Sequence, residues 1–286
     1  QNVAAMNNKG IEFNLSWRDS KDDFSYEISF NGSLNKNRIT ELPEQVYYTW
    51  GCGNGDNITN VGHPLGSWLG YKTDGLFRTQ AEVDEYMSRY QVQYGAPGVG
   101  RLRYVDTNGD NVINAKDRIF MGSDQPKFIG GLNFSANWKG FDLSLFFNGM
   151  VRQAWNNSKF YTNLWAYWSG NHSTRLLEAY DAWENYEKTG RYDSDIPALT
   201  TSGSNNENGS SDFFVENGSY LKLKTLTLGY TLPEKVLEKC HLRNLRVYLQ
   251  AQNLFTITSY TGADPEGLGF PYPIPRTFTF GLSVGL

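Results

Sequence analysis

The sequence is poor in the residues from which metal centres and nucleophilic active sites are most often built. Its 286 residues include 2 cysteines, Cys52 and Cys240, and 3 histidines. Two cysteines are too few for a disulfide scaffold, the chain has no Cys-x-x-Cys pair, and its three histidines are scattered along the sequence. We therefore expect no zinc site and no Cys/His or Ser/His/Asp catalytic centre.

Long apolar runs and an excess of positive charge are also missing. No stretch approaches the ~18 consecutive apolar residues of a membrane-spanning helix. The net charge is −4, which argues against nucleic acid as a partner because phosphates favour a basic protein face. These two absences exclude a helical membrane protein and a typical nucleic-acid-binding domain.

Aromatic side chains, in contrast, are abundant, with 8 Trp, 18 Tyr and 17 Phe. Many lie in segments where apolar and polar residues alternate, which is the period of a β-strand with one apolar face. The alternation predicts seven strands. In the fifth of them the apolar phase moves from odd positions at Leu221 and Leu223 to an even position at Leu226, which predicts a β-bulge. The predicted strands lie near residues 11–17, 24–37, 127–138, 141–150, 220–231, 245–257 and 276–286.

The connections between these strands alternate strictly between short and long. Short turns follow the first and third strands, whereas long loops span residues 38–126 and 151–219. All short turns therefore lie at one end of the sheet, an arrangement that a soluble sandwich has no physical reason to adopt. It is typical of an outer-membrane barrel. The sequence thus predicts an all-β, antiparallel transmembrane β-barrel, multi-pass in a bacterial outer membrane, with apolar residues facing lipid and polar residues facing the lumen.

The long loops contain signals of local structure. Thr79 and Glu82 form a capping box that predicts a short helix to about Arg89. Apolar residues at helical spacing predict a second helix over residues 173–188, which Gly190 can end. The Ser-, Asn- and Gly-rich stretch 200–212 is predicted to be a mobile loop tip.

One loop segment has the spacing of an EF-hand calcium site. Oxygen-bearing side chains occupy positions 1, 3, 5, 9 and 12, and position 7 offers a backbone carbonyl. Position 6 is Asn111 in place of the usual Gly, but Asn tolerates the left-handed conformation. The alternative is an Asx-rich turn that binds nothing. We expect Ca²⁺ as a structural ligand of Asp106, Asn108, Asp110, Val112, Asn114 and Asp117.

Aromatic residues cluster in the second long loop, at Trp155, Tyr161, Trp165, Tyr167 and Trp168. Flat aromatic faces suit stacking on a sugar ring, so these residues are candidate substrate contacts. The alternative is that they pack into a small core of the loop or against a partner. Both interpretations stay open at this stage.

No arrangement in the sequence indicates an enzyme. The carboxylates of Glu178, Asp181 and Glu184 share one predicted helix, whereas a glycosidase needs two carboxylates facing each other across a cleft. A solvated helix face explains them better, and we predict no bond-breaking chemistry.

Several motifs resemble the C-terminal barrel of the SusC/RagA family of TonB-dependent outer-membrane transporters. They include DTNGDNVINAKDR, then PKFIGGLNFSANWKGFDLSLFFNG, NGSYLKLKTLTLGYTLP, LRVYLQAQNLFTITSYTGADPE and the closing PRTFTFGLSVGL. The resemblance implies a 22-stranded barrel with an internal plug, energised by TonB. It also implies a SusD-like surface lipoprotein that lids the barrel and delivers oligosaccharide or peptide fragments.

The sequence departs from that family pattern in what it contains. It has no plug domain and no TonB box, and seven strands cannot close a 22-stranded barrel. We therefore expect the plug and the remaining strands to lie on sequence outside this chain, with the present strands in contact with the lipid bilayer. The alternative is a secreted, soluble, carbohydrate-binding β-sandwich stapled by calcium. A barrel portion should need detergent, whereas a sandwich should be a soluble monomer.

Overall fold

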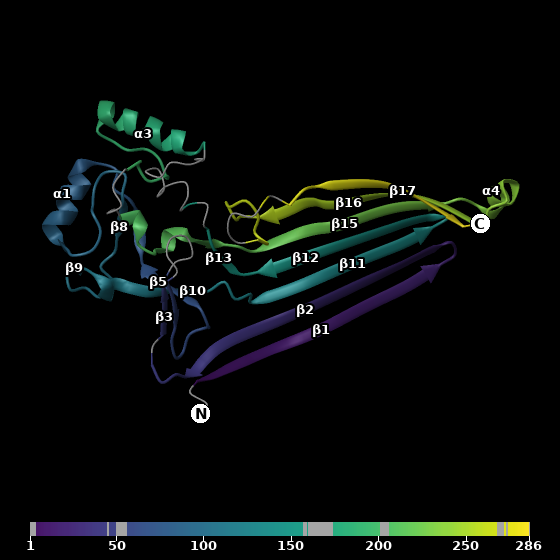
Figure 1. Ribbon diagram of the computed structural model, residues 1–286, viewed down its shortest axis with the longest axis horizontal. Helices are drawn as coiled ribbons and strands as arrows, with labels where there is room; N and C mark the ends of the chain where they lie inside the picture. Colours follow the sequence, from purple (N-terminus) through teal and green to yellow (C-terminus); the bar gives the residue numbers. More distant parts are fainter. Residues whose placement is uncertain are drawn as a thin grey trace.

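The computed structural model describes residues 4–44, 46–49, 56–156, 159, 174–200, 206–267, 272 and 274–285. Its main element is a seven-stranded antiparallel sheet in the order β1-β2-β11-β12-β15-β16-β17. Neighbours in the sheet follow one another along the chain, as in an up-and-down barrel wall, and the predicted antiparallel all-β fold is confirmed (Figure 1). The strands are β1 Ala5–Lys21, β2 Phe24–Glu41, β11 Phe128–Trp138, β12 Phe141–Val151, β15 Tyr220–Thr231, β16 Asn244–Thr258 and β17 Thr277–Gly285.

The first strand is much longer than the alternation suggested. β1 begins at Ala5, before the predicted start at residue 11, because backbone pairing with β2 continues through Asn7 and Asn8 although their side chains are polar. Alternation detects only the part of a strand that has one apolar face.

The phase change predicted in the fifth strand is a β-bulge. In the β12–β15 ladder, Phe146 pairs with Thr225 and Phe147 pairs with Leu223, so Lys224 is left without a partner position. The β15–β16 ladder shifts at the same place, where Asn253 adopts a φ of 53°. The bulge returns Leu226 to the face of Leu223, so β15 keeps one apolar face along its length.

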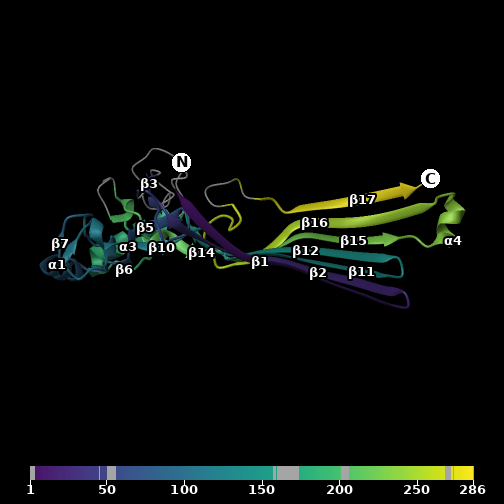
Figure 2. The same cartoon turned by 90° about the horizontal axis from the view of Figure 1, so that it is seen from below.

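The two ends of the sheet are unlike. Tight turns lie at the end where the chain's C-terminus is found, and the β11–β12 turn uses Lys139 and Gly140, both at positive φ. The third connection at this end holds α4, Glu234–Leu237. At the other end the chain leaves the sheet for long excursions after β2, β12 and β16. Seen nearly edge-on in Figure 2, the sheet is a single curved layer with the long excursions beyond one end.

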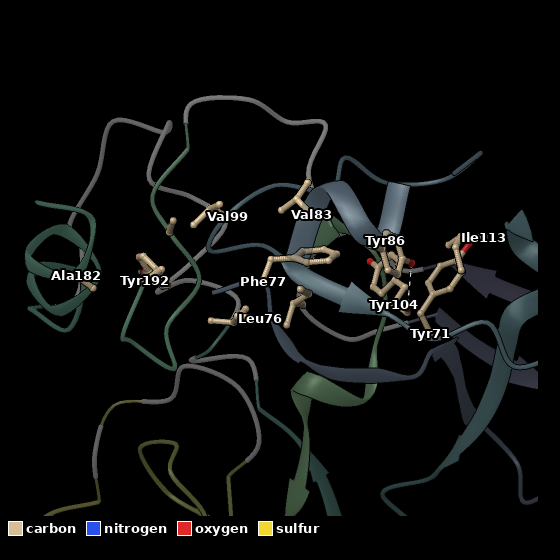
Figure 3. Packing of buried hydrophobic residues seen from close by; sticks show 12 residues of the cluster. Tyr71, Leu76, Phe77, Val83, Tyr86, Val99, Tyr104, Ile113, Ala182 and Tyr192 are labelled. Atoms are coloured by element: carbon tan, nitrogen blue, oxygen red, sulfur yellow. Dashed lines mark hydrogen bonds between the residues drawn. The ribbon is translucent and has the colours of Figure 1, made fainter. Parts of the chain in front are cut away.

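The two longest excursions fold together into one body, which we call the loop assembly. The first contributes β3 Val46–Thr49, β4 Asp56–Thr59, β5 Ser67–Tyr71, β6 Thr73–Leu76, α1 Gln80–Arg89, β7 Gln91–Val92, β8 Leu102–Tyr104, β9 Val112–Ile113 and β10 Arg118–Gly122. The second contributes β13 Gln153–Trp155, α3 Leu176–Thr189 and β14 Val215–Asn217. Its main core gathers Phe77, Tyr86 and Tyr104 from the first excursion with Ala182 and Tyr192 from the second (Figure 3). Both clusters of buried hydrophobic residues found among the described residues therefore lie outside the main sheet.

Both predicted helices form. Thr79 caps α1 by accepting a hydrogen bond from the Glu82 backbone N–H, and Gly190 ends α3 at a φ of 75°. None of the described helices is both long enough and apolar enough to cross a membrane.

The predicted mobile tip at 200–212 needs correction for its second half. Residues 201–205 lie outside the described residues, but Asn206, Glu207 and Ser211 are among the most buried polar residues of the described chain. Composition suggested solvent exposure, whereas the side chains of Asn206 and Glu207 hydrogen-bond to backbone groups of the first excursion.

Candidate functional site

The main sheet presents one apolar face whose side chains are in register across all seven strands. Successive cross-strand pairs join them directly, so no polar residue interrupts the middle of the face. Trp17 is 64% exposed and Phe280 74% exposed, and no other described helix or strand lies flat against the main sheet (Figure 2). The central row is Trp17, Ile28, Phe134, Leu145, Leu226, Ala251 and Phe278.

The opposite face is polar and equally regular. Its central row runs from Ser16 and Ser29, whose hydroxyls hydrogen-bond at 3.1 Å, to Thr225, Gln252 and Thr277, with Phe146 as the apolar exception. A two-sided sheet of this kind separates an apolar environment from an aqueous one.

An ion pair on the polar face depends on a glycine. Arg246 of β16 donates to both carboxylate oxygens of Asp142 on β12, at 2.9 and 2.6 Å, although β15 lies between the two strands. A Cβ on Gly229 of β15 would approach Asp142 Oδ1 to 2.4 Å and Arg246 Nη2 to 2.5 Å. Gly229 therefore leaves the space in which the guanidinium reaches across a strand.

A second charged group lies at the loop end of the sheet. The Nζ of Lys222, which is 2% exposed, is 3.1 Å from both oxygens of Asp264 and 3.0 Å from Glu266 Oε2. Lys224, the bulge residue, donates to Glu266 at 2.6 and 2.7 Å. Burial alone would raise the pKa of Glu266, but hydrogen bonds from the two lysines outweigh burial and the pKa is lowered. The bulge thus anchors the segment after β16 to the sheet.

The same segment is tied to the loop assembly. Glu216 of β14 accepts hydrogen bonds from the backbone and hydroxyl of Thr261, at 2.9 and 2.8 Å, and pairs with Lys159 at 2.8 Å. Burial is the largest single influence and would raise the pKa of Glu216, but these donors together lower it.

Buried polar contacts lock the two long excursions together. Arg101 Nη1 lies 2.8 Å from Glu207 Oε2, and the two side chains are 11% and 1% exposed. Glu207 Oε1 also accepts the Leu102 backbone N–H at 2.8 Å. Asn206 accepts the Ala96 N–H at 2.6 Å and donates to the Leu102 carbonyl. The side chains of Arg101, Asn206 and Glu207 would be costly to bury unpaired, so these contacts hold the two excursions together.

The predicted calcium loop is folded by hydrogen bonds to its own backbone. Asp106 accepts the N–H groups of Gly109 and Asn111 at 2.7 and 2.8 Å, and Asn111 has the expected left-handed φ of 60°. Burial would raise the pKa of Asp106, but these backbone donors lower it. Asp117 is fully buried and accepts from Thr107 and Asn114.

Carboxylates alone do not form a metal centre in this loop. Within the described ranges, no group of three or more His, Cys, Asp or Glu side chains is placed to hold a metal ion. An EF-type site would also use the side-chain oxygens of Asn108 and Asn114 and the Val112 carbonyl. These ligands are not His, Cys, Asp or Glu side chains. Asn108 and Asp110 Oδ1 each accept a backbone N–H two residues on, at 2.8 and 2.9 Å, and each oxygen keeps a second lone pair.

Of the five aromatic residues predicted to contact substrate, one is described by the structure. Trp155 is 5% exposed and packs between Trp68 and Phe214, with ring centroids 6.0 and 5.1 Å away. Its ring faces are covered, which supports the packing interpretation for this residue. Tyr161, Trp165, Tyr167 and Trp168 lie outside the described residues.

Sequence reasoning missed the residues that hold the loops. Nothing in the sequence around Arg101, Glu207 and Lys222 shows that these charged residues are buried and paired. One sequence signal did point to this region: the phase change in β15 predicts a bulge at the position of Lys224, which lies beside Lys222.

The chain is similar along nearly its whole length to known TonB-dependent receptors. No protein-family profile matches it. TonB-dependent receptor P3 of Formosa agariphila is 31% identical over 99% of this chain and 29% of its own length. TonB-dependent receptor SusC of Bacteroides thetaiotaomicron is 29% identical over 99% of this chain and 27% of its own length. The chain thus spans less than a third of these relatives.

Solved structures give the same result. A structure of the RagAB peptide transporter covers 100% of this chain with a TM-score of 0.72 at 25% identity. The 'open-open' state of the RagAB peptide importer matches with a TM-score of 0.70 at the same identity. The match takes in 30% and 29% of those chains.

Proposed function

We propose that the chain is a barrel portion of a SusC/RagA-family TonB-dependent receptor and forms part of a nutrient importer in the bacterial outer membrane, which its similarity to such receptors supports. The observation that carries this proposal is the uncovered apolar face, in register across seven strands. An exposed apolar face of this extent is unfavourable in water. Lipid is the environment that suits it, which also disfavours the soluble calcium-stapled sandwich.

The height of the apolar face fits a bilayer. Phe24 and Leu34 of β2, like Phe128 and Trp138 of β11, mark its two edges. Their separation along the strand is about 33 Å at about 3.3 Å per residue. A strand tilt of about 40° reduces this to about 25 Å, the height of the apolar band of an outer-membrane barrel. The long excursions then lie on the cell exterior and the tight turns in the periplasm.

The sheet is an arc of a larger wall. Among the described strands, β1 and β17 each pair on one side only, and open edges of this kind do not persist in a membrane. We propose that further strands, completing 22, close the barrel on both edges, and that a plug domain elsewhere in the receptor occupies the lumen and contacts TonB. The polar face would then line that lumen.

The loop assembly would lie at the outer opening of the barrel, where a partner protein could bind. Its own buried core makes it a rigid platform, on which a SusD-like lipoprotein would sit as a lid. We propose that the ligand is an oligosaccharide or a peptide, with Tyr161, Trp165, Tyr167 and Trp168 as contacts. Substrate is moved without bond-breaking chemistry, so no catalytic residue is assigned.

We also propose that the loop of Asp106, Asn108, Asp110, Val112, Asn114 and Asp117 binds Ca²⁺ as a structural ion. The left-handed φ of Asn111 supports this, since position 6 of an EF-type loop needs that sharp turn. The ion would strengthen the loop assembly rather than take part in transport.

The transport proposal is tested with the whole receptor in its native host. Deleting the receptor gene should abolish uptake of at least one compound from a panel of fluorescent oligosaccharides and peptides, and deleting TonB should abolish the same uptake. The receptor should be found in the outer-membrane fraction and require detergent for extraction. Recovery of the receptor as a detergent-free soluble protein would contradict the proposal. Double substitution of Trp165 and Trp168 by Ala should reduce that uptake at least tenfold.

A further inference from the structure

Three cations lie just beyond the loop-side edge of the apolar face. In the β1–β2 ladder, Lys9 pairs directly with Lys36, and Asn7 pairs with Arg38. Because side chains alternate along a strand, Lys9, Lys36 and Arg38 share the face of Ile11 and Leu34 and not that of the polar residues. We call these three residues the basic rim cluster.

The basic rim cluster lines two adjoining pockets. These have volumes of about 940 and 420 Å³, and both are lined by Lys9, Lys36, Arg38 and Gly62. Among the described residues, no acidic side chain lines either pocket.

Such an arrangement is unfavourable unless a counter-charge is present. Like charges directly opposite each other in an antiparallel ladder destabilise the pairing, and Lys9 and Lys36 are such a pair. The other directly opposed pair of charged residues in the described ladders of the main sheet, Arg18 and Glu27, is of opposite sign. The concentration of positive charge therefore points to an anion supplied from outside the chain.

The position of the cluster identifies the environment of that anion. Leu34 marks the edge of the apolar face, and Lys36 and Arg38 follow it by two and four residues on the same side. At about 3.3 Å per residue, they lie about 7 to 13 Å further along the strand. This is the headgroup level of the outer leaflet, and the outward face excludes a ligand that travels through the lumen.

We infer that the basic rim cluster binds the phosphorylated headgroup of an outer-leaflet lipid. Lysine supplies a point charge and arginine a two-pronged donor, and both are the usual protein partners of phosphate. Clusters of such residues beside an apolar membrane surface recognise anionic lipid headgroups. The inference rests on the membrane placement in the proposed function, and it adds a lipid site that transport itself does not require.

The test measures lipid binding by the full receptor in detergent. The probes are diphosphorylated lipid A and the same lipid A without its phosphates. We expect the receptor to bind the phosphorylated form at least about tenfold more tightly. A triple variant, Lys9→Gln, Lys36→Gln and Arg38→Gln, should lose that preference. The matched variant, Lys21→Gln, Lys188→Gln and Lys235→Gln, removes three exposed cations elsewhere and should keep it.

Heat-modifiable gel mobility establishes that each variant barrel is folded. Equal binding of both lipids by the unaltered receptor, or an unchanged preference in the folded triple variant, would overturn the inference. Displacement of the lipid by an equimolar amount of inorganic phosphate would overturn it too, because the ligand would then be a free anion. Loss of the lipoprotein partner with lipid binding intact would assign the cluster to protein docking instead. In each case normal uptake would leave the transport proposal standing.

Discussion

Arg101 and Glu207 form a buried ion pair of 2.8 Å that joins the two long excursions of the chain. Both side chains also hydrogen-bond to the backbone: Glu207 accepts the Leu102 N–H, and Arg101 donates to the carbonyl of Ala198. Residues that are remote in sequence thereby form one platform at the loop end of the sheet.

Replacing Glu207 by Ala should separate the two excursions. The substitution leaves the Arg101 guanidinium buried without its counter-charge, a loss of about 3 kcal/mol or more. Limited proteolysis of the folded receptor should show rapid cleavage within the loop assembly while the barrel stays intact. Asp195→Asn is the control, because Asp195 also pairs with an arginine but is 96% exposed. Equal protease resistance of the two variants would contradict a locking role for Glu207.

The segment after β16 should loosen in acid. Its anchors Glu216 and Glu266 both have a lowered pKa. A lowered folded-state pKa contributes stability above the unfolded pKa of about 4.3, and the contribution is lost as the pH falls through the folded value. The hydrogen-exchange protection factors of residues 259–267, taken relative to the intrinsic exchange rate at each pH, should therefore fall on acidification below about pH 4.3. In Glu266→Gln exchange should be faster at neutral pH and depend less on acid, and an unchanged acid dependence would argue against this anchor.

A side chain at Gly229 should break the Asp142–Arg246 pair. Gly229→Val places atoms where the guanidinium lies, and overpacking of this kind costs about 1–3 kcal/mol. The temperature at which the barrel loses heat-modifiable mobility should fall. Gly149→Ala is the matched control, since its Cβ would meet its nearest neighbours at an ordinary 3.4 Å. If Gly149→Ala lowered that temperature more than Gly229→Val, Gly229 would not be needed to leave space for the Asp142–Arg246 pair.

Calcium should stabilise the loop assembly of the unaltered receptor. A ligand that binds only the folded state raises stability with its concentration, so millimolar Ca²⁺ should slow proteolysis near residues 106–117 and a chelator should reverse the effect. Asp110→Asn keeps the shape of the side chain but removes a charge, and it should abolish the response. Asp124→Asn should leave it unchanged. A calcium response that survives in Asp110→Asn would argue against this loop as the site.

The strands and their phase could be predicted from sequence because a sheet with one apolar and one polar face imposes a strict period of two. Even the bulge of β15 is visible, since Leu223 and Leu226 must reach the same face. The excursions follow no such rule. Trp155 is of a residue type that suits stacking on sugar, but it is buried. Asn206 and Glu207 lie in a Ser-, Asn- and Gly-rich stretch whose composition predicts solvent exposure, but they are buried too. Their environments are set by contacts with residues about a hundred positions away, as between Arg101 and Glu207, and no local pattern encodes these.

The most direct test of the account asks which medium each face of the sheet contacts. Leu145 and Ser144 are adjacent residues of β12 on the apolar and polar faces. A spin label attached to Leu145→Cys in the bilayer-inserted receptor should be relaxed by lipid-soluble oxygen and shielded from a water-soluble nickel chelate. A label on Ser144→Cys should be shielded from lipid and should not show that oxygen preference. Preferential access of the nickel chelate to the Leu145 label would contradict the placement of the apolar face in the membrane.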